Sequence, residues 1–312
     1  MSLADNIFKN MCEDIITNGT STEGQKVRPH WDDGTPAYTI KKFGVVNRYD
    51  LREEFPAITF RKTAIKSATD EILWIFQKKS NNINDLNSHI WDEWADKNGS
   101  IGKAYGYQVG EQYIHHQLPT RGILSNVYEM YPSSLASYVD DGDKQYTRVH
   151  LDQIDAVLYD LKNNPFSRRI MTNLWNFQDL HEMNLQPCCW SCNFNVTDEG
   201  GDKLVLNMVL NQRSSDVLTA NNWNVVQYAI LLKMIAQVSN MEAGVLLHCI
   251  TDAHIYDRHV DIIKEIINRE TYPAPIVTLN PDIKSFYDFR TSDITVENYQ
   301  VGGPQVSIPI AI

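Results

Sequence analysis

Apolar residues recur every three to four positions in several stretches of the chain, which predicts amphipathic helices. In the amino-terminal stretch MSLADNIFKNMCED, the inward positions would be Ile7, Met11 and Ile15 or Ile16. In a second predicted helix, residues 60–79, Glu71 lies beside the apolar face. The helices predicted in this way cover residues 1–14, 60–79, 151–162, 223–240 and 256–268.

Other stretches are typical of β-strands. These are RRIMTNLWNF, CNFNVTD, KLVLNMVLNQRSSD and residues 244–251, and DEGGD favours a hairpin turn between the second and third. Residues 204–210 are apolar at nearly every position, so we expect that strand to be covered on both faces. Strands in series with helices between groups favour an α+β fold around one sheet. Residues 111–149 show no clear periodicity, and we interpret them as a surface insertion.

Composition excludes several classes of protein. The net charge of −11 argues against a dedicated nucleic-acid binder, whose affinity would depend on many basic contacts to phosphates. The amino terminus lacks a signal peptide, and the most apolar window, 223–238, is too short and too polar to span a bilayer. The number of cysteines, five, is odd, which argues against a disulfide framework. We therefore expect a cytoplasmic protein with no membrane partner.

Three of the five cysteines lie together in QPCCWSCNF. A zinc site needs a further Cys/His pair nearby, and the sequence offers none. Cys189 and Cys192 match C-x-x-C, but on a strand they point to opposite faces, which disfavours a redox pair. We interpret both as small apolar packing residues. Cys188 differs because it follows Pro187, which removes a ladder donor where a strand begins at the rim of a cleft.

Two basic motifs could serve such a thiol. NPFSRR supplies Arg168 and Arg169, and NQRSSD supplies Arg213 with Ser214 and neighbouring polar groups. Arginine's planar fork suits a phosphate, and a nearby cation lowers the pKa of a thiol. Each motif alone is also compatible with a solvated surface or with a helix cap.

Taken in order, the motifs resemble one known family. NPFSRR, LWNFQDL, LQPCCWSCNF, NQRSSD, WNVVQY, DAHIYDRH and the terminal IPIAI follow the order and spacing of the motifs of thymidylate synthase. DEILWIFQ, HIWDEWAD and GSIGKAYGYQ fit the same pattern upstream. The resemblance covers almost the whole chain except 111–149. It implies one catalytic domain over residues 1–312, with a mixed sheet, helices around it and a homodimer packed sheet to sheet.

The resemblance implies a reaction and a nucleophile. The family converts dUMP and 5,10-methylenetetrahydrofolate to dTMP and dihydrofolate, and it uses no metal. Cys188 occupies the nucleophile position, and its thiolate would add to C6 of the uracil. Asn224 would bind N3 and O4 of the pyrimidine. The catalytic residues implied are Cys188, Glu71, Tyr105, Arg213, Asn224 and Asp216.

Binding residues follow from the same resemblance, position by position. Those for dUMP are Arg28, Gln212, Arg213, Ser214, Ser215, Asp216, Asn224, His254, Ile255 and Tyr256, with Arg168 and Arg169 donated by the partner subunit. Those for the folate are Arg61, Glu71, Trp91, Trp94, Leu185, Asp216, Ala220, Trp223, Ala311 and Ile312. The last two belong to a tail that would close over the folate and exclude water.

The sequence also departs from the family's commonest pattern. Cys189 stands where a histidine is usual, Ala220 where a glycine is usual, and Trp223 where a phenylalanine is usual. Two alternatives stay open. One is a dUMP hydroxymethylase of the same fold, in which water completes the reaction. The other is a non-enzymatic thiol or metal-binding module built on CCWSC.

Overall fold

The structure is a computed structural model that describes residues 1–110, 112–117, 136–139 and 146–312. The chain divides into two compact units. The first, which we call the terminal unit, comprises Met1–Thr69 and Asp198–Ile312. The second, the central unit, comprises Asp70–Thr197.

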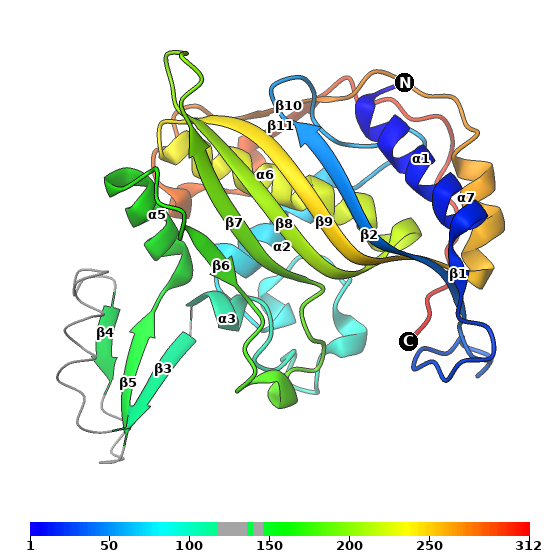
Figure 1. The fold of residues 1–312 in the computed structure, drawn as a ribbon, viewed down its shortest axis with the longest axis horizontal. Helices are drawn as coiled ribbons and strands as arrows, with labels where there is room; N and C mark the ends of the chain where they lie inside the picture. Colours follow the sequence, from blue (N-terminus) through cyan, green and yellow to red (C-terminus); the bar gives the residue numbers. More distant parts are fainter. Residues whose placement is uncertain (111, 118–135, 140–145) are drawn as a thin grey trace. The chain divides into compact units, whose positions relative to one another are not determined.

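Four strands form the sheet of the terminal unit. Their order is β1 (Thr20–Ser21), β2 (Thr39–Asp50), β9 (Glu242–Tyr256) and β8 (Val205–Asp216). β2 runs antiparallel to β9, whereas β8 runs parallel to it. A parallel pair needs a crossover connection, and the helix α6 (Asn222–Val238) supplies it and lies along one face of β8 and β9 (Figure 1).

The packing of α6 explains the burial pattern of β8. Leu206, Met208 and Leu210 are fully buried, whereas Asn207 and Val209 between them are only half-buried. The prediction that this strand is covered on both faces was therefore wrong for the single chain, because α6 covers only one face. Most of α6 is buried, and each buried leucine or isoleucine side chain contributes about 1.5–3 kcal/mol.

Helices and short strands complete the terminal unit. α1 (Leu3–Asn18) packs against β2 and begins with a capping box in which Ser2 and Asp5 cap each other. Phe8, Met11 and Ile15 are buried on its inner face, whereas Ile7 is only half-buried. The predicted helix 256–268 is shorter, since β9 continues to Tyr256 and η5 (Asp257–His259) precedes α7 (Val260–Ile266). β10 (Ile276–Leu279) pairs with β11 (Ile294–Glu297).

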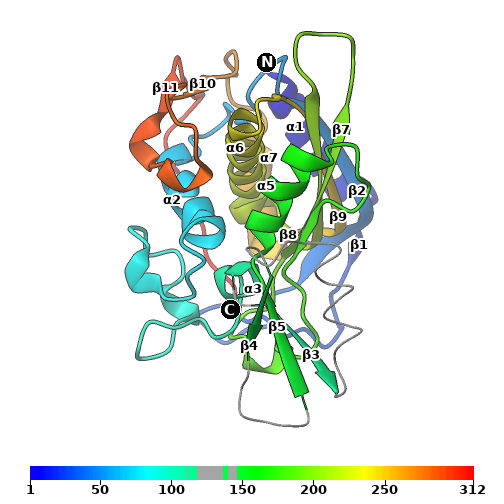
Figure 2. The ribbon, with the colours of Figure 1, turned by 90° about the vertical axis from the view of Figure 1, so that its left-hand side faces the viewer.

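The central unit carries a small antiparallel sheet and short helices (Figure 2). β3 (Gln112–Gln117), β5 (Tyr146–Leu151) and β4 (Ala136–Val139) form that sheet in the order β3-β5-β4. We predicted a surface insertion at 111–149, and apart from these three strands that segment lies outside the described residues. α3 (Gly106–Gly110) precedes this sheet and α5 (Gln153–Asn163) follows it, with Asp152 capping α5. The helix α2 (Ile65–Phe76) contains the boundary between the two units.

A second strand pair of the central unit leads to the cysteines. β6 (Met171–Asn173) pairs antiparallel with β7 (Cys189–Thr197). The strand predicted over 168–177 is thus limited to three residues. No helix in the described part of the chain is long and apolar enough to cross a membrane.

Candidate active site

Cys188 lies in the central unit, at the residue directly before β7. It is half-buried, and its backbone N–H donates to the hydroxyl oxygen of Tyr105 at 3.2 Å. The expectation that Cys188 precedes the start of a strand is confirmed. Cys189 and Cys192 are buried within the strand, as expected for packing residues.

The other thiols are poorly suited to attack. Burial raises the pKa of Cys192 to about 12, and burial also raises the pKa of Cys12 and of Cys249. At neutral pH these three side chains therefore stay protonated, whereas the nucleophile in such chemistry is a thiolate. Position and chemistry together leave Cys188 as the candidate nucleophile.

Tyr105 occupies an unusual backbone position. Its φ of 47° lies in the left-handed region, which non-glycine residues rarely adopt. The ring is buried, and this burial, followed by the neighbouring Cys188, raises the pKa of the phenol well above its usual value. Tyr105 therefore keeps its proton, and while its oxygen accepts from Cys188 its O–H remains available as a donor.

Aromatic rings surround a buried carboxylate in the same unit. The indole N–H of Trp91 donates to Oε1 of Glu71 at 2.8 Å, and Glu71 is only 6% exposed. Ring centroids of Trp91 lie 4.9 Å from Tyr105 and 5.7 Å from Trp94. Leu185 is half-buried. The cluster offers aromatic rings, packed edge to face, beside one carboxylate, and such rings can pack against a planar heterocycle.

Arg168 and Arg169 lie in the turn that follows α5. Both side chains are exposed, and the backbone N–H of Arg169 donates to Oγ of Ser167 at 3.3 Å. This placement suits contact with a group outside the single chain.

In the terminal unit, polar side chains gather where β8 ends and α6 begins. Gln212 is buried, and its amide nitrogen donates to the carbonyl of Ser214 at 2.9 Å and to Oδ1 of Asn224 at 3.1 Å. Nδ2 of Asn224 donates to Oε1 of Gln227 at 3.1 Å. Asn224 is half-buried, so part of its amide can meet a ligand. Arg213 is also half-buried in this region.

Asp216 caps the π-helical turn η4 (Val217–Asn221) by accepting from the N–H groups of Leu218 and Thr219. Nδ1 of His259 lies 3.7 Å from Oδ1 of Asp216, a distance that suits an ion pair. Burial alone would raise the pKa of Asp216, but the imidazole of His259, together with Thr219 and His254, lowers that pKa overall. For His259 burial favours the neutral ring, but Asp216, together with the carbonyl of Pro309 and with Asp257, raises the pKa overall. The geometry thus maintains an ionised carboxylate.

The end of β9 carries two polar rings. His254 and Tyr256 lie side by side with centroids 5.3 Å apart, as expected for alternate residues of a strand. Nδ1 of His254 lies 2.9 Å from Oδ1 of Asp252. Ile255 between the rings is fully buried and points to the opposite face. A ligand could therefore reach only the backbone of Ile255. Ser215 is likewise buried, and its hydroxyl accepts from Asn221 at 3.4 Å.

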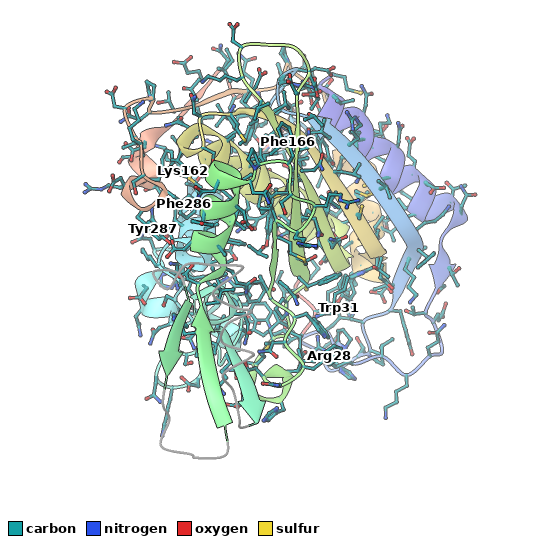
Figure 3. The ribbon with its side chains drawn as sticks, turned by 60° about the vertical axis from the view of Figure 1, so that its left-hand side comes forward. Arg28, Trp31, Lys162, Phe166, Phe286 and Tyr287 are labelled. Carbon is teal, nitrogen blue, oxygen red and sulfur yellow. The ribbon has the colours of Figure 1, made fainter. Side chains whose placement is uncertain are left out.

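The carboxy-terminal tail, residues 304–312, docks onto the terminal unit. Ile312 and His30 exchange two backbone hydrogen bonds of 2.8 and 3.0 Å. Arg28, an exposed residue, and the buried Trp31 come from the loop that joins β1 to β2, and Figure 3 shows them near each other. Arg61 donates to the carbonyl of Leu218, and burial lowers its pKa. Ala311 is half-buried, as are Ala220 and Trp223 near the start of α6.

Comparison with known proteins assigns this arrangement to one family. The family model described as thymidylate synthase matches residues 6–312. The chain belongs to the thymidylate synthase family. It is 39% identical to thymidylate synthase of Bacillus subtilis subsp. natto and 38% identical to that of Bacillus phage phi3T, in each case over 97% of both chains. The family resemblance and the enzyme class, a methyltransferase, are thereby confirmed.

A solved structure confirms the fold class. The chain is similar to the thermostable thymidylate synthase A from Bacillus subtilis, with a TM-score of 0.82, 38% identity and 99% of each chain covered. The expected α+β fold with a mixed sheet is therefore confirmed. Folate as the co-substrate of the thymidylate synthase family also agrees with the expectation. Among the described residues no group of three or more His, Cys, Asp or Glu side chains could hold a metal ion.

Two residues near the candidate site were not predicted from the sequence. His248 is fully buried on β9, and Nε2 lies 2.6 Å from Oε1 of Gln212. His259 joins Asp216 to the tail, since Nε2 donates to the carbonyl of Pro309 at 2.8 Å. A signal for His248 existed, because it is a polar residue at a core-facing position between Leu246 and Ile250.

Proposed function

We propose that the chain converts dUMP and 5,10-methylenetetrahydrofolate to dTMP and dihydrofolate through a covalent bond between Sγ of Cys188 and C6 of the pyrimidine. The observation that carries this proposal is the placement of Cys188, half-buried before a strand and hydrogen-bonded through its backbone to Tyr105, in a member of this family. 5,10-Methylenetetrahydrofolate supplies the one-carbon unit and the hydride.

The protein's own residues carry the covalent step. Addition of the Cys188 thiolate to C6 forms the S–C6 bond, moves the C5=C6 electron pair toward C5 and O4, and makes C5 nucleophilic. The amide of Asn224 stabilises the charge that develops on O4. Glu71 and Tyr105 hold or move protons near the pyrimidine, which accords with a buried carboxylate and a phenol that stays protonated.

Arginines and hydroxyls bind the remainder of dUMP. Arg28, Arg213 and Ser214 contact the phosphate, with Arg168 and Arg169 from the partner subunit. His254 and Tyr256 contact the ribose 3′-hydroxyl. Gln212 lines the pyrimidine site, and Ile255 and Ser215 contribute through backbone groups because their side chains are buried.

The residues assigned to the folate fit its chemistry. Asp216 remains ionised beside His259 and can accept hydrogen bonds from pterin N–H groups. Trp91, Trp94 and Leu185 supply an apolar wall, with Ala220 and Trp223 near the start of α6. Arg61 lies beside Leu218 and contributes positive charge. Ala311 and Ile312 close over the folate and exclude water.

We also propose a homodimer of single-domain subunits over residues 1–312, working in the cytoplasm. The sheet face opposite α6 supports the dimer, because it carries half-buried Val209, Leu247 and Cys249 beside Val46, which is 58% exposed. Apolar side chains on an open sheet face are typical of a subunit interface, and here they lie beside the polar side chains of Arg48 and Asn211. Free cysteines accord with a reducing compartment.

The decisive experiment is a spectroscopic assay of dihydrofolate formation with identification of the nucleotide product. We expect dihydrofolate and dTMP to form in equal amounts, and only when dUMP is present. Formation of 5-hydroxymethyl-dUMP without dihydrofolate would replace this proposal with the hydroxymethylase. A protein inert toward dUMP would favour the thiol-binding module.

A further inference from the structure

A chain of hydrogen-bonded side chains, one imidazole and three amides, runs from β9 through β8 to α6. Nε2 of His248 lies 2.6 Å from Oε1 of Gln212, whose Nε2 lies 3.1 Å from Oδ1 of Asn224. Nδ2 of Asn224 continues to Oε1 of Gln227 at 3.1 Å. His248, Gln212 and Gln227 are 0%, 1% and 2% exposed, so water cannot readily replace a lost partner.

A backbone carbonyl determines which group donates and which accepts at each hydrogen bond between His248, Gln212 and Asn224. The oxygen of Ser214 can only accept, so the group of Gln212 that lies 2.9 Å from it is the nitrogen. Oε1 of Gln212 must then face His248, and the imidazole must donate from Nε2. In the described part of the chain Nδ1 of His248 has no hydrogen-bond partner, and burial lowers the pKa of the ring to about 3. His248 is therefore neutral and carries its proton on Nε2.

The orientation of the Gln212 amide determines the orientation of the Asn224 amide. Its Oδ1 accepts from Gln212 and its Nδ2 donates to Gln227, which leaves one lone pair and one hydrogen for a ligand. A uracil ring offers the complementary pair, a donor at N3 and an acceptor at O4. Cytosine offers the reverse pair, an acceptor at N3 and a donor at N4, and needs the amide turned over.

Turning the amide over would break the chain at Gln212. Nδ2 of Asn224 would then face the nitrogen of Gln212. Gln212 cannot turn as well, because its oxygen would then face the Ser214 carbonyl, and its nitrogen would face the N–H of His248. Buried groups left unpaired in this way are costly.

We infer that His248 is a positioning residue that selects a uracil over a cytosine nucleotide, by holding Gln212 and thereby the carboxamide of Asn224 in the orientation that matches uracil. The inference rests on the proposed function, in which Asn224 binds the pyrimidine. His248 touches no substrate itself and acts only through the two amides.

Binding of dUMP and of dCMP to the intact protein tests the inference. We expect His248→Leu, which removes the donor, to raise the dissociation constant of dUMP about tenfold and to lower the preference for dUMP over dCMP about tenfold. His248→Gln can donate from a similar position and should stay within about threefold of the wild type. Leu246→Val, a control on the same face of β9, should leave the preference unchanged.

The outcomes separate the inference from the proposed function. A wild-type protein with no preference for dUMP would overturn the function itself. A wild type that prefers dUMP, together with a His248→Leu variant that keeps the preference, would overturn only the role of His248. If His248→Leu does not fold, a His248→Gln variant that loses the preference while its stability is unchanged would overturn it equally.

Discussion

Nε2 of His259 donates a hydrogen bond to the carbonyl oxygen of Pro309 at 2.8 Å. The other ring nitrogen lies 3.7 Å from Asp216, so one imidazole joins the tail to the carboxylate assigned to the pterin. The pair stabilises both charged forms, because the pKa of Asp216 is lowered and that of His259 is raised. The stability that this ion pair contributes therefore depends on pH.

The first prediction concerns this dependence. The contribution of His259 is fully present below the usual histidine pKa of about 6.5 and is lost as pH rises through its raised pKa. That of Asp216 is present above about 3.9 and is lost as pH falls through its lowered pKa. His259→Gln keeps a donor for Pro309 but removes the charge. Urea unfolding of both proteins should show wild-type stability falling toward that of the variant as pH rises above about 6.5. Parallel curves would contradict the ion pair.

The second prediction separates the clustered cysteines. Cys188→Ala should abolish release of tritium from 5-tritiated dUMP, a loss of about four orders of magnitude or more, because no covalent adduct can form. Cys189→Ala and Cys192→Ala should stay within about tenfold of the wild type, since both side chains are buried packing groups. Equal losses in all three variants would favour a site in which the cysteines act together.

The third prediction concerns the phenol beside the nucleophile. Tyr105→Phe removes the acceptor of the Cys188 N–H, and a lost neutral hydrogen bond of about 0.5–1.5 kcal/mol should lower kcat about two- to thirteenfold. The effect should fall on kcat more than on KM, because Tyr105 orders the nucleophile. Tyr107→Phe, a change of the same kind two residues away, serves as the control. An unchanged kcat for Tyr105→Phe would contradict the assigned role.

Periodicity predicted the elements whose packing is regular. α5 and α6 follow their apolar repeats because one face of α5 and nearly all of α6 are buried. β2 was missed, since its exposed residues do not alternate regularly with apolar ones. Its twelve residues are fixed by pairing with β9, which a local pattern cannot reveal.

The site residues also differ in how far the local sequence predicts them. Cys188 was predicted from Pro187 and its motif, because both are local in sequence. The role of His248 depends on Gln212 and Asn224, which lie 36 and 24 positions away, and on the direction of hydrogen bonds between them. The order of the motifs identifies the family. It does not show which atom donates in the hydrogen bonds between His248, Gln212 and Asn224.

The last prediction tests whether two subunits share each active site. In the proposed homodimer the nucleophile comes from one subunit and Arg168 and Arg169 from the other. Cys188→Ala and the double variant Arg168→Ala/Arg169→Ala should each be nearly inactive as a pure dimer. If the two are unfolded and refolded together, about half of the dimers are mixed, and each mixed dimer has one complete site. Activity should then recover to roughly one quarter of the wild type. If the mixture stays inactive although mixed dimers form, the exposed arginines serve their own subunit. In that case a mixed dimer contains no complete site.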